Sequence, residues 1–358
     1  MLVSTDINKG VLMNKYIEIS GRKIGLDYKP LVIAEIGINH NGSLIEAKKL
    51  ADAAKKAGAE IVKHQTHIIN EEMSELAKKA IPGNSPHSIW DIMARCALTE
   101  NEELEFKEYV ESLGMIFIST PFSFAAVDRL EKFNVPAYKI GSGEMNNYEF
   151  VKYVASKNKP IILSTGMNNI SAVKKAVDCI LEYHNQFVIL HTTNLYPTQP
   201  EQIRLGALEE LKQAFPNEII GLSDHSLNNL ACLSAVALGA SVLERHFTDT
   251  KERKGEDIIC SMDINECSAL IKNSAEIAKM RGGRKEALPE EQVTIEFAFS
   301  TLVARCNLIA GHQITREDLT TKRPFITGIL ASDMNKVIGK TLVKDISVGN
   351  HIHWDDIQ

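Results

Sequence analysis

Residues 219–247 read IIGLSDHSLNNLACLSAVALGASVLERHF, and this stretch decides the fold of most of the chain. A β-branched run, IIGLSD (219–224), is followed by an uncharged helical stretch (229–238) and by a second strand-like run, SVLERHF (241–247). Two short apolar strands joined by a helix form the βαβ unit of a parallel sheet. The order of these segments therefore predicts an α/β protein.

The same alternation of strand and helix begins at residue 31. Six earlier strand-like runs are LVIAEIG (31–37), EIVKHQ (60–65), MIFIST (115–120), AYKIG (137–141), PIILST (160–165) and FVILHT (187–192). Helical patterns cover residues 45–57, 102–113, 125–133, 172–183 and 229–238. Eight strands within roughly 250 residues match a closed (β/α)8 TIM barrel. No GxGxxG follows the first strand, which argues against an open doubly wound sheet.

The flanking segments divide the rest of the chain. Residues 1–30 are predicted to form an N-terminal β-hairpin cap, and residues 31–280 the catalytic barrel. Gly, Pro and charged residues in MRGGRKEALPEEQ mark a linker, assigned to residues 281–293. Residues 294–358 contain short strand-like pieces such as FAFSTLVA (297–304) and HIHW (351–354). They predict a small, mostly-β accessory domain.

The composition excludes several classes of protein. A hydrophobic fraction of 44% and a charged fraction of 24% are typical of a globular protein. The net charge of -6, without a long basic run, argues against nucleic acid as a partner. The N-terminal residues lack the apolar core of a secretory signal, which predicts a cytoplasmic protein, and residues 230–243 are too short to span a membrane. Six cysteines without a CxxC pair indicate reduced thiols.

Polar residues stand at the end of every predicted strand, where a TIM barrel holds its active site. In chain order they are Glu35, Lys63, Gln65, Ser119, Thr120, Lys139, Ser142, Ser164, Thr165, His191, Asn194, Ser223, His225, Glu244 and His246. Two lysines among hydroxyls can neutralise a phosphate and a carboxylate together. This pattern predicts a site for an anionic, phosphorylated substrate. The glycines in GSGE (141–144) and STGM (164–167) are expected either to admit phosphate oxygens or to form plain turns.

Two histidines follow neighbouring strands of the predicted barrel. His225 and His246 lie beside Asp224 and Glu244, and together they favour a shared divalent metal over two separate structural roles. Two imidazoles leave coordination positions open for substrate oxygens, so Mn²⁺ or Mg²⁺ fits better than a closed structural Zn²⁺.

The run HQTH (64–67) offers a choice between two neighbouring side chains. His64 and Gln65 lie on opposite faces of their strand, so only one of them can face the mouth of the barrel. We select Gln65.

With these residues in view, the chain resembles a known family. The motifs AEIGINHNG, VKHQTH, FISTPFS, YKIGSGE, ILSTGMN, HTTNLYPT, GLSDHS and LERHFTD look like those of the bacterial N-acetylneuraminate (sialic acid) synthases, in family order. The resemblance extends over nearly the whole chain. KRP (322–324) resembles a signature of the antifreeze-like (SAF) domain that follows the barrel in this family.

The resemblance implies an activity, a cofactor and a set of site residues. The reaction would be condensation of phosphoenolpyruvate with N-acetylmannosamine and water to give N-acetylneuraminate and phosphate. His225 and His246 would bind the metal, with Mn²⁺ preferred to Mg²⁺. The residues implied in catalysis are Glu35, Glu244, Lys63 and Lys139. The residues implied in substrate binding are Thr120, Ser142, Ser164, Asn194, Ser223, Gln65, Tyr196, Asp257 and Arg323.

The resemblance also implies a homodimer with swapped C-terminal domains, in which Arg323 acts on the partner's sugar. Three other functions stay open. A synthase of legionaminic or pseudaminic acid would use the same phosphoenolpyruvate and metal sites. A Schiff-base aldolase would use Lys63 or Lys139 as an amine nucleophile and would need no metal. A glycan-binding scaffold would use the C-terminal domain alone.

Overall fold

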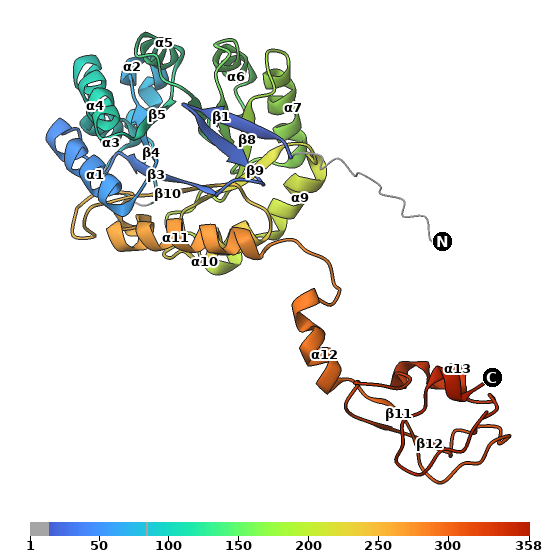
Figure 1. The fold of residues 1–358 in the computed structure, drawn as a ribbon. Helices are drawn as coiled ribbons and strands as arrows, with labels where there is room; N and C mark the ends of the chain where they lie inside the picture. Colours follow the sequence, from blue (N-terminus) through green and yellow to red (C-terminus); the bar gives the residue numbers. More distant parts are fainter. Residues whose placement is uncertain (1–13, 84) are drawn as a thin grey trace. The chain divides into compact units, whose positions relative to one another are not determined.

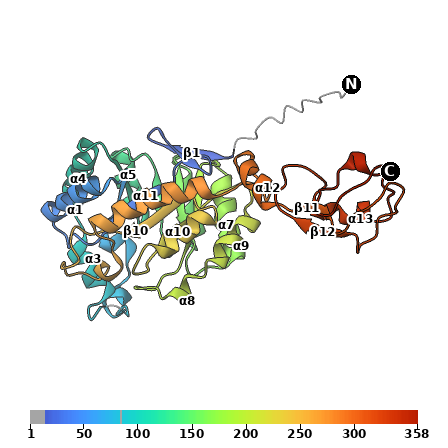
Figure 2. The same cartoon turned by 60° about the horizontal axis from the view of Figure 1, so that its bottom comes forward.

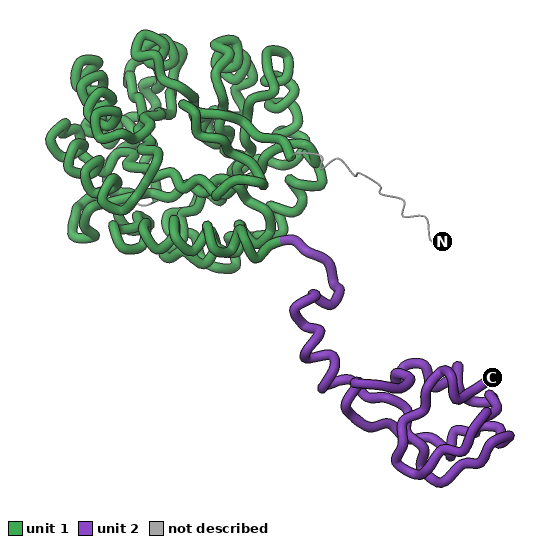
Figure 3. The backbone as a smooth tube through the Cα atoms, in the orientation of Figure 1, with its two compact units in different colours: residues 1–281 green, residues 282–358 purple. Residues whose placement is uncertain are grey.

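The computed structural model describes residues 14–83 and 85–358. The chain forms two compact units, residues 1–281 and residues 282–358 (Figure 3). Residues 1–13 of the predicted N-terminal cap lie outside the described residues.

Unit 1 is built on a closed parallel barrel, which confirms the predicted fold class (Figure 1). Its strands are β3 (Leu31–Gly37), β4 (Ile61–Thr66), β5 (Ile116–Pro121), β6 (Tyr138–Ile140), β7 (Ile161–Ser164), β8 (Phe187–Thr192), β9 (Ile219–Asp224) and β10 (Val242–His246). They pair in sequence order, and β10 closes the barrel by pairing with both β9 and β3. All eight strands therefore end at one face.

Helices surround the barrel. The longer ones are α1 (Leu44–Ala57), α4 (Glu100–Ser112), α5 (Phe124–Lys132), α6 (Tyr148–Ala155), α7 (Ile170–Leu181), α9 (Gly206–Ala214), α10 (Leu230–Ala237) and α11 (Ile264–Met280). α3 (Ile89–Cys96) has eight residues, as α6 and α10 do, and the two helices of four residues are α2 (Ile69–Glu72) and α8 (Pro200–Ile203). Capping boxes at Thr99 and Asp263 satisfy the first backbone N–H groups of α4 and α11. In Figure 2, α10 and α11 lie side by side against the barrel.

An antiparallel hairpin closes the N-terminal end of the barrel. It pairs β1 (Tyr16–Ile19) with β2 (Arg22–Gly25). Ile17, Ile19 and Ile24 are fully buried against the side chains that fill the barrel interior. This apolar plug leaves the opposite face, where the strands end, as the face available for chemistry.

Unit 2 has its own small apolar core. It contains α12 (Gln292–Ala298), β11 (Thr301–Ala304), β12 (Leu319–Lys322) and α13 (Met334–Val337), and β11 pairs with β12 in antiparallel orientation. The prediction of a strand over residues 297–304 is wrong for its first residues, because α12 continues to Ala298. The strand begins only at Thr301, where every residue is buried.

Two predictions from composition concern the whole chain. All six cysteines lie in the described part and are free thiols. Within the described residues, we find no helix that is both long and apolar enough to cross a membrane.

Candidate active site

The strand ends enclose a polar cavity of about 230 Å³, here called the inner compartment. Its lining brings together nearly all the predicted site residues: Glu35, Lys63, Gln65, Thr120, Lys139, Ser142, Ser164, Asn194, Tyr196, Ser223, His225, Glu244 and His246. They come from all eight strand ends, and the barrel closure is what places them within reach of one another.

Two buried lysines and two buried carboxylates form the floor of this compartment. Lys63 Nζ lies 2.8 Å from Glu35 Oε2 and 3.8 Å from Glu244 Oε1. Lys139 Nζ lies 3.4 Å from the same oxygen of Glu244. Each lysine also donates to a hydroxyl, Lys63 to Thr120 at 3.1 Å and Lys139 to Ser164 at 2.7 Å. The lysines are therefore partly neutralised within the protein.

Burial and neighbouring charge act in opposite directions on these groups. Burial alone would lower the pKa of Lys63, but the charges of Glu244 and Glu35 outweigh it and raise this pKa. For Lys139, burial outweighs the charge of Glu244 and lowers the pKa. Burial would raise the pKa of Glu244, yet Lys139, Lys63 and a hydrogen bond from Ser223 lower it. Glu244 therefore stays ionised at neutral pH.

The predicted histidine pair meets at the rim of the inner compartment. The ring centroids of His225 and His246 lie 5.5 Å apart, and the Tyr196 ring stacks on His225 at 4.1 Å. His225 Nδ1 donates to the carbonyl of Thr193 at 2.8 Å, which leaves the lone pair on Nε2. Burial lowers the pKa of His225 to about 3 and that of His246 to about 4, so both imidazoles are neutral.

These residues suit a metal ion in part. Neutral imidazoles are the form that binds a metal. His246 Nδ1 and Glu244 Oε2 are buried without a hydrogen-bond partner among the described residues. Buried polar atoms are normally paired, so these two atoms are available to bind a ligand. The described residues contain no group of three or more His, Cys, Asp or Glu side chains arranged as a metal site. The protein would thus supply few ligands and leave positions open.

Gly166 allows two side chains of the inner compartment, Ser142 and Asn194, to approach the backbone closely. Gly166 N donates to Ser142 Oγ at 3.0 Å. A Cβ at Gly166 would overlap Asn194 Oδ1 and would lie 2.9 Å from Ser142 Oγ. The glycine is therefore required for the close approach of these two side chains, which a plain turn would not explain.

A second cavity, of about 670 Å³, adjoins the first and is here called the outer compartment. The two share Gln65, Phe122, Asn194, Tyr196 and His246. The predicted residue Asp257 lines the outer compartment, with its Oδ2 3.5 Å from His246 Nδ1. Burial raises the pKa of this carboxyl to about 7.

Three strand-end residues that we expected at the mouth, His191, Ser119 and Thr165, do not face it, and neither does Asp224, which we placed beside the histidine pair. Asp224 lies 3.4 Å from the buried Arg245, His191 bonds the carbonyl of Ile203, Ser119 bonds Thr66, and Thr165 bonds the carbonyl of Leu190. Each immediately precedes or follows a residue that does line the inner compartment, and successive side chains of a strand point to opposite sides. The predicted place of the first three was therefore wrong.

Arg323 belongs to unit 2, whereas the other predicted site residues belong to unit 1. Its side chain is exposed, and it makes no hydrogen bond or ion pair with the described part of that unit.

Sequence comparison matches residues 50–286 to the NeuB family and residues 300–358 to the SAF domain. The chain belongs to the NeuB family. It is 34% identical to the N,N'-diacetyllegionaminic acid synthase of Legionella pneumophila, over 91% of this chain and 94% of that protein. It is 31% identical to human N-acetylneuraminate-9-phosphate synthase, over 90% and 91%.

A solved structure extends the NeuB-family likeness to three dimensions. The N-acetylneuraminic acid (sialic acid) synthetase of Leptospira borgpetersenii, crystallised with citrate, superposes with a TM-score of 0.73 at 29% identity. The match covers 79% of this chain and 96% of that one. Like these synthases, the chain is an enzyme, of the transferase class.

Phe122, which lines both compartments, and His67, which holds Gln65, escaped the sequence analysis. His67 lies 3.1 Å from Gln65 Oε1 through its Nε2, and Gln65 Nε2 in turn donates to Glu35 at 2.8 Å. The His67 ring stacks on Phe122 at 4.5 Å, with Glu72 bound to its other nitrogen. Residues two apart in a strand share a face, so HQTH already placed His67 beside Gln65.

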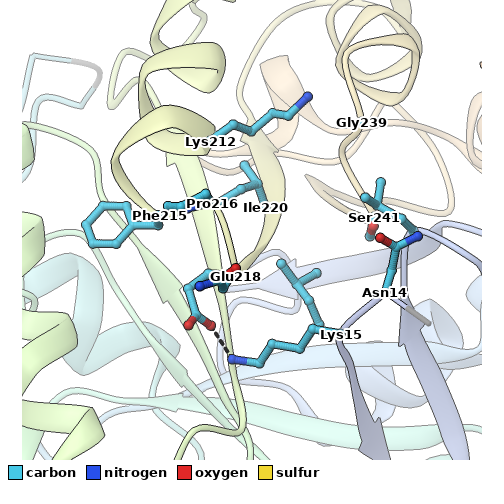
Figure 4. Close-up of a pocket in the computed structure, with 12 residues that line it drawn as sticks. Asn14, Lys15, Lys212, Phe215, Pro216, Glu218, Ile220, Gly239 and Ser241 are labelled. Atoms are coloured by element: carbon cyan, nitrogen blue, oxygen red, sulfur yellow. Dashed lines mark hydrogen bonds and ion pairs between the residues drawn. The ribbon is translucent and has the colours of Figure 1, made fainter. Parts of the chain in front are cut away.

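A third cavity lies at the other end of the barrel and has a different character. It has a volume of about 430 Å³ and is lined by the start of β9, the residues before β10 and the segment leading into β1 (Figure 4). Lys15 and Glu218 pair with each other there. Because it lies at the N-terminal ends of the strands, it is separate from the site described above.

Proposed function

We propose that this enzyme condenses phosphoenolpyruvate with N-acetylmannosamine and water, giving N-acetylneuraminate and phosphate. The observation that carries the proposal is the buried pair of Lys63 and Lys139, which bind hydroxyls and line the same cavity as the two histidines. A synthase of legionaminic or pseudaminic acid is the alternative. It uses the same chemistry on a differently acylated sugar, and relatives at 31–35% identity are named N,N'-diacetyllegionaminic acid synthase and pseudaminic acid synthase.

The inner compartment fits phosphoenolpyruvate. Lys63 and Lys139 supply positive charge for its phosphate and carboxylate. The side chains proposed to hold its oxygens are Thr120, Ser142, Ser164, Asn194 and Ser223. Buried, fixed donors stabilise developing charge without having to reorganise during the reaction.

The charge balance supports a divalent cation as cofactor. Glu35 and Glu244 offset the two lysines, so the cluster alone supplies little net positive charge to an anionic substrate. We propose that His225 and His246 hold Mn²⁺, with Mg²⁺ as the alternative. When bound, such an ion would polarise the aldehyde oxygen of the open-chain sugar as a Lewis acid.

The remaining steps use the protein's own residues. The C=C π pair of phosphoenolpyruvate forms the bond from C3 to the sugar aldehyde carbon, and the aldehyde oxygen takes up a proton to become a hydroxyl. Water then adds to the cationic C2. Glu35, held by Lys63 and Gln65, is placed to accept the proton of that water. The bond from C2 to the bridging oxygen then breaks, and phosphate leaves with that oxygen while Lys139 offsets its charge.

The sugar is proposed to extend into the outer compartment. Gln65 and Tyr196 border both compartments, and Asp257 lines the outer one, so all three can contact its hydroxyl or acylamino groups. Arg323 is proposed to join them from a second subunit, in a homodimer with exchanged C-terminal units.

Mass spectrometry of the product tests the proposal. The enzyme with Mn²⁺ and phosphoenolpyruvate is offered each candidate sugar in turn, and a product nine carbons long in its backbone is expected with N-acetylmannosamine. Absence of any condensed product with every sugar would refute the proposal. A product only from a 2,4-diacetamido-2,4,6-trideoxymannose would support the alternative.

The lowered pKa of Lys139 favours a second candidate, a Schiff-base aldolase, because a buried lysine can act as a nucleophile. Borohydride reduction in the presence of pyruvate distinguishes the two. An aldolase becomes covalently labelled and keeps its activity in EDTA, whereas the proposed synthase stays unlabelled.

A further inference from the structure

Two charged residues stand opposite each other behind the histidine pair, on the outer side of the barrel. Arg245 of β10 and Asp224 of β9 are partners in the register of these parallel strands. Both side chains are almost completely buried, and Arg245 Nε lies 3.4 Å from Asp224 Oδ2. The residues that follow them, His246 and His225, line the inner compartment, since successive side chains of a strand point to opposite sides.

The two arms of the Arg245 guanidinium hold the loop that follows His225. Nη1 donates to Asn229 Oδ1 at 2.6 Å, and Nη2 donates to the carbonyl of Ser226 at 2.7 Å. Arg245 itself immediately precedes His246 in the sequence. One side chain therefore connects the strand end that carries one histidine to the loop that carries the other.

Asp224 holds the same loop from the neighbouring strand. Its Oδ1 accepts a hydrogen bond from Ser226 N, and its Oδ2 accepts one from Ser226 Oγ, both at 2.9 Å. His225 lies between Asp224 and Ser226 in the sequence. The backbone that carries its imidazole is therefore fixed on both sides.

Stability alone does not account for this buried pair of charges. An ion pair in such a place gives little net stability, since both charges lose their hydration. An arginine, however, supplies a planar fork of donors that holds several acceptors in one geometry. The histidines have few such contacts of their own. His225 Nδ1 bonds the carbonyl of Thr193, and His246 Nδ1 has no hydrogen-bond partner among the described residues.

We infer that Arg245 and Asp224 are positioning residues for the histidine pair. They fix the end of β10 against the loop after β9, and this sets the spacing at which the two imidazoles can share a divalent cation. The inference rests on the proposed function, which assigns the cation to these histidines. It adds two residues that act through the histidines, from behind the strands that carry them.

Arg245→Lys separates positioning from charge. This variant keeps a positive charge beside Asp224 but has no fork that reaches both Asn229 and the Ser226 carbonyl. We expect Mn²⁺ to bind about tenfold more weakly in calorimetry, the lower end of the effect of groups that support metal ligands. In the metal-free protein, the amides of residues 225–229 should exchange with deuterium about tenfold faster, because the loop is less firmly held.

Arg129→Lys is the matched control. Arg129 of α5 also forms a largely buried ion pair, with Glu103 at 3.1 Å, but that pair lies behind β4, away from the histidines. The same chemical change there should leave Mn²⁺ binding and the exchange of residues 225–229 at their wild-type values. This control separates a loss of positioning from a general loss of stability.

A second variant keeps the test open if Arg245→Lys does not fold. Asn229→Ala removes only the acceptor of one arm of the guanidinium, at a half-buried position. It should weaken Mn²⁺ binding and speed exchange of the loop in the same direction.

The results distinguish this inference from the proposed function. If the folded variants bind Mn²⁺ as tightly as the wild type, or if Arg129→Lys weakens binding equally, Arg245 does not position the histidines, and the proposed reaction still stands. If the wild-type enzyme binds no Mn²⁺ and keeps its activity in EDTA, the proposed cation and this inference are both wrong.

Discussion

Lys63 Nζ lies 2.8 Å from Glu35 Oε2, and both side chains are almost completely buried at the end of neighbouring strands. Register places them directly opposite each other, since Glu35 of β3 pairs with Lys63 of β4. A buried ion pair of this kind gives little net stability, because the lost hydration of both charges offsets their attraction. Its position in the inner compartment therefore supports the chemical role that we propose for it.

This pair gives the first prediction. Lys63→Met leaves the buried Glu35 without its counter-charge, and Glu35→Gln leaves the buried Lys63 with Glu244 alone, so each should lower the free energy of unfolding by about 3 kcal/mol. The double variant should be destabilised by less than the sum of the two. All three should lose turnover. Urea unfolding and phosphate release measure the two effects.

An exposed pair provides the control. Lys49 and Glu46 pair at the surface of α1, and Lys49→Met should change stability by less than about 1 kcal/mol. Full activity in the double variant would contradict a chemical role for the buried pair.

Metal removal gives the second prediction. EDTA should abolish turnover and Mn²⁺ should restore it, because the proposed Lewis acid has no substitute in this site. His225→Ala and His246→Ala should weaken Mn²⁺ binding measured by calorimetry, whereas His87→Ala, at an exposed position, should bind normally. Wild-type turnover in EDTA would rule out the metal.

The third prediction concerns Gly166. In Gly166→Ala the new Cβ would displace Asn194 and Ser142, and a displacement of about 1 Å in a site can cost about 100-fold in rate. We expect such a loss in kcat/KM for phosphoenolpyruvate with an unchanged circular dichroism spectrum. Gly206→Ala, where a Cβ meets nothing within 4 Å, is the control. Equal activity of the two variants would show that the close packing of Asn194 is unimportant.

Much of the barrel and of its site could be predicted from sequence, because the strands of a parallel barrel all end at one face. The strands LVIAEIG, FVILHT and IIGLSD were predicted with the bounds that the structure gives them. Polar residues at strand ends then had to meet at one face. Alternation along a strand was the finer rule: it required that only one of His64 and Gln65 face the mouth, and Gln65, which we chose, is the one that lines the inner compartment.

The same alternation shows why other residues were misplaced. At the end of β8 and β9 the sequence offers two adjacent polar residues, and polarity alone does not tell which one faces inward. His191 and Asp224 face away from the mouth because their partners lie outside the barrel interior. His191 bonds the Ile203 carbonyl, and Asp224 pairs with Arg245. The apolar residues of α3 that line the outer compartment, Ile89, Ile92 and Met93, were also missed. Their place in the site depends on contacts between segments that are distant in the sequence.

Glu103 gives the fourth prediction, on stability and pH. It is buried behind β4, where His64, Thr66 and Arg129 contact its carboxylate. Burial would raise its pKa, but these partners outweigh it and lower the pKa. A lowered pKa in the folded state stabilises the fold above the unfolded-state pKa of about 4.3, and this stability is lost as pH falls through the folded value.

Comparison of the wild-type protein with Glu103→Gln isolates the contribution of this carboxylate to stability, because the two proteins have all their other carboxylates in common. The variant should be less stable by about 3 kcal/mol at pH 7, in urea unfolding followed by circular dichroism. The difference should shrink as the pH falls below about 4.3. A difference that stays constant down to the lowest pH would show that the charge of Glu103 does not matter.

Arg323 gives the fifth prediction, and it concerns subunit exchange. The side chain is exposed and forms no hydrogen bond or ion pair with the described residues of unit 2, so it is available to a site elsewhere. We expect Arg323→Ala to raise KM for the sugar more than for phosphoenolpyruvate. A chain truncated near residue 285 should keep the barrel spectrum, because the barrel core lies within unit 1, but should turn over poorly.

Mixing two inactive chains decides whether Arg323 acts on its own subunit. A dimer of one Arg323→Ala chain and one Lys139→Ala chain contains one intact site only if the arginine reaches the partner's barrel. In that case, subunit exchange should restore up to about a quarter of wild-type activity, because half of the dimers are mixed and each has one of its two sites intact. If both parents dimerise and exchange yet no activity returns, Arg323 serves its own barrel and the proposed exchange of C-terminal units is wrong.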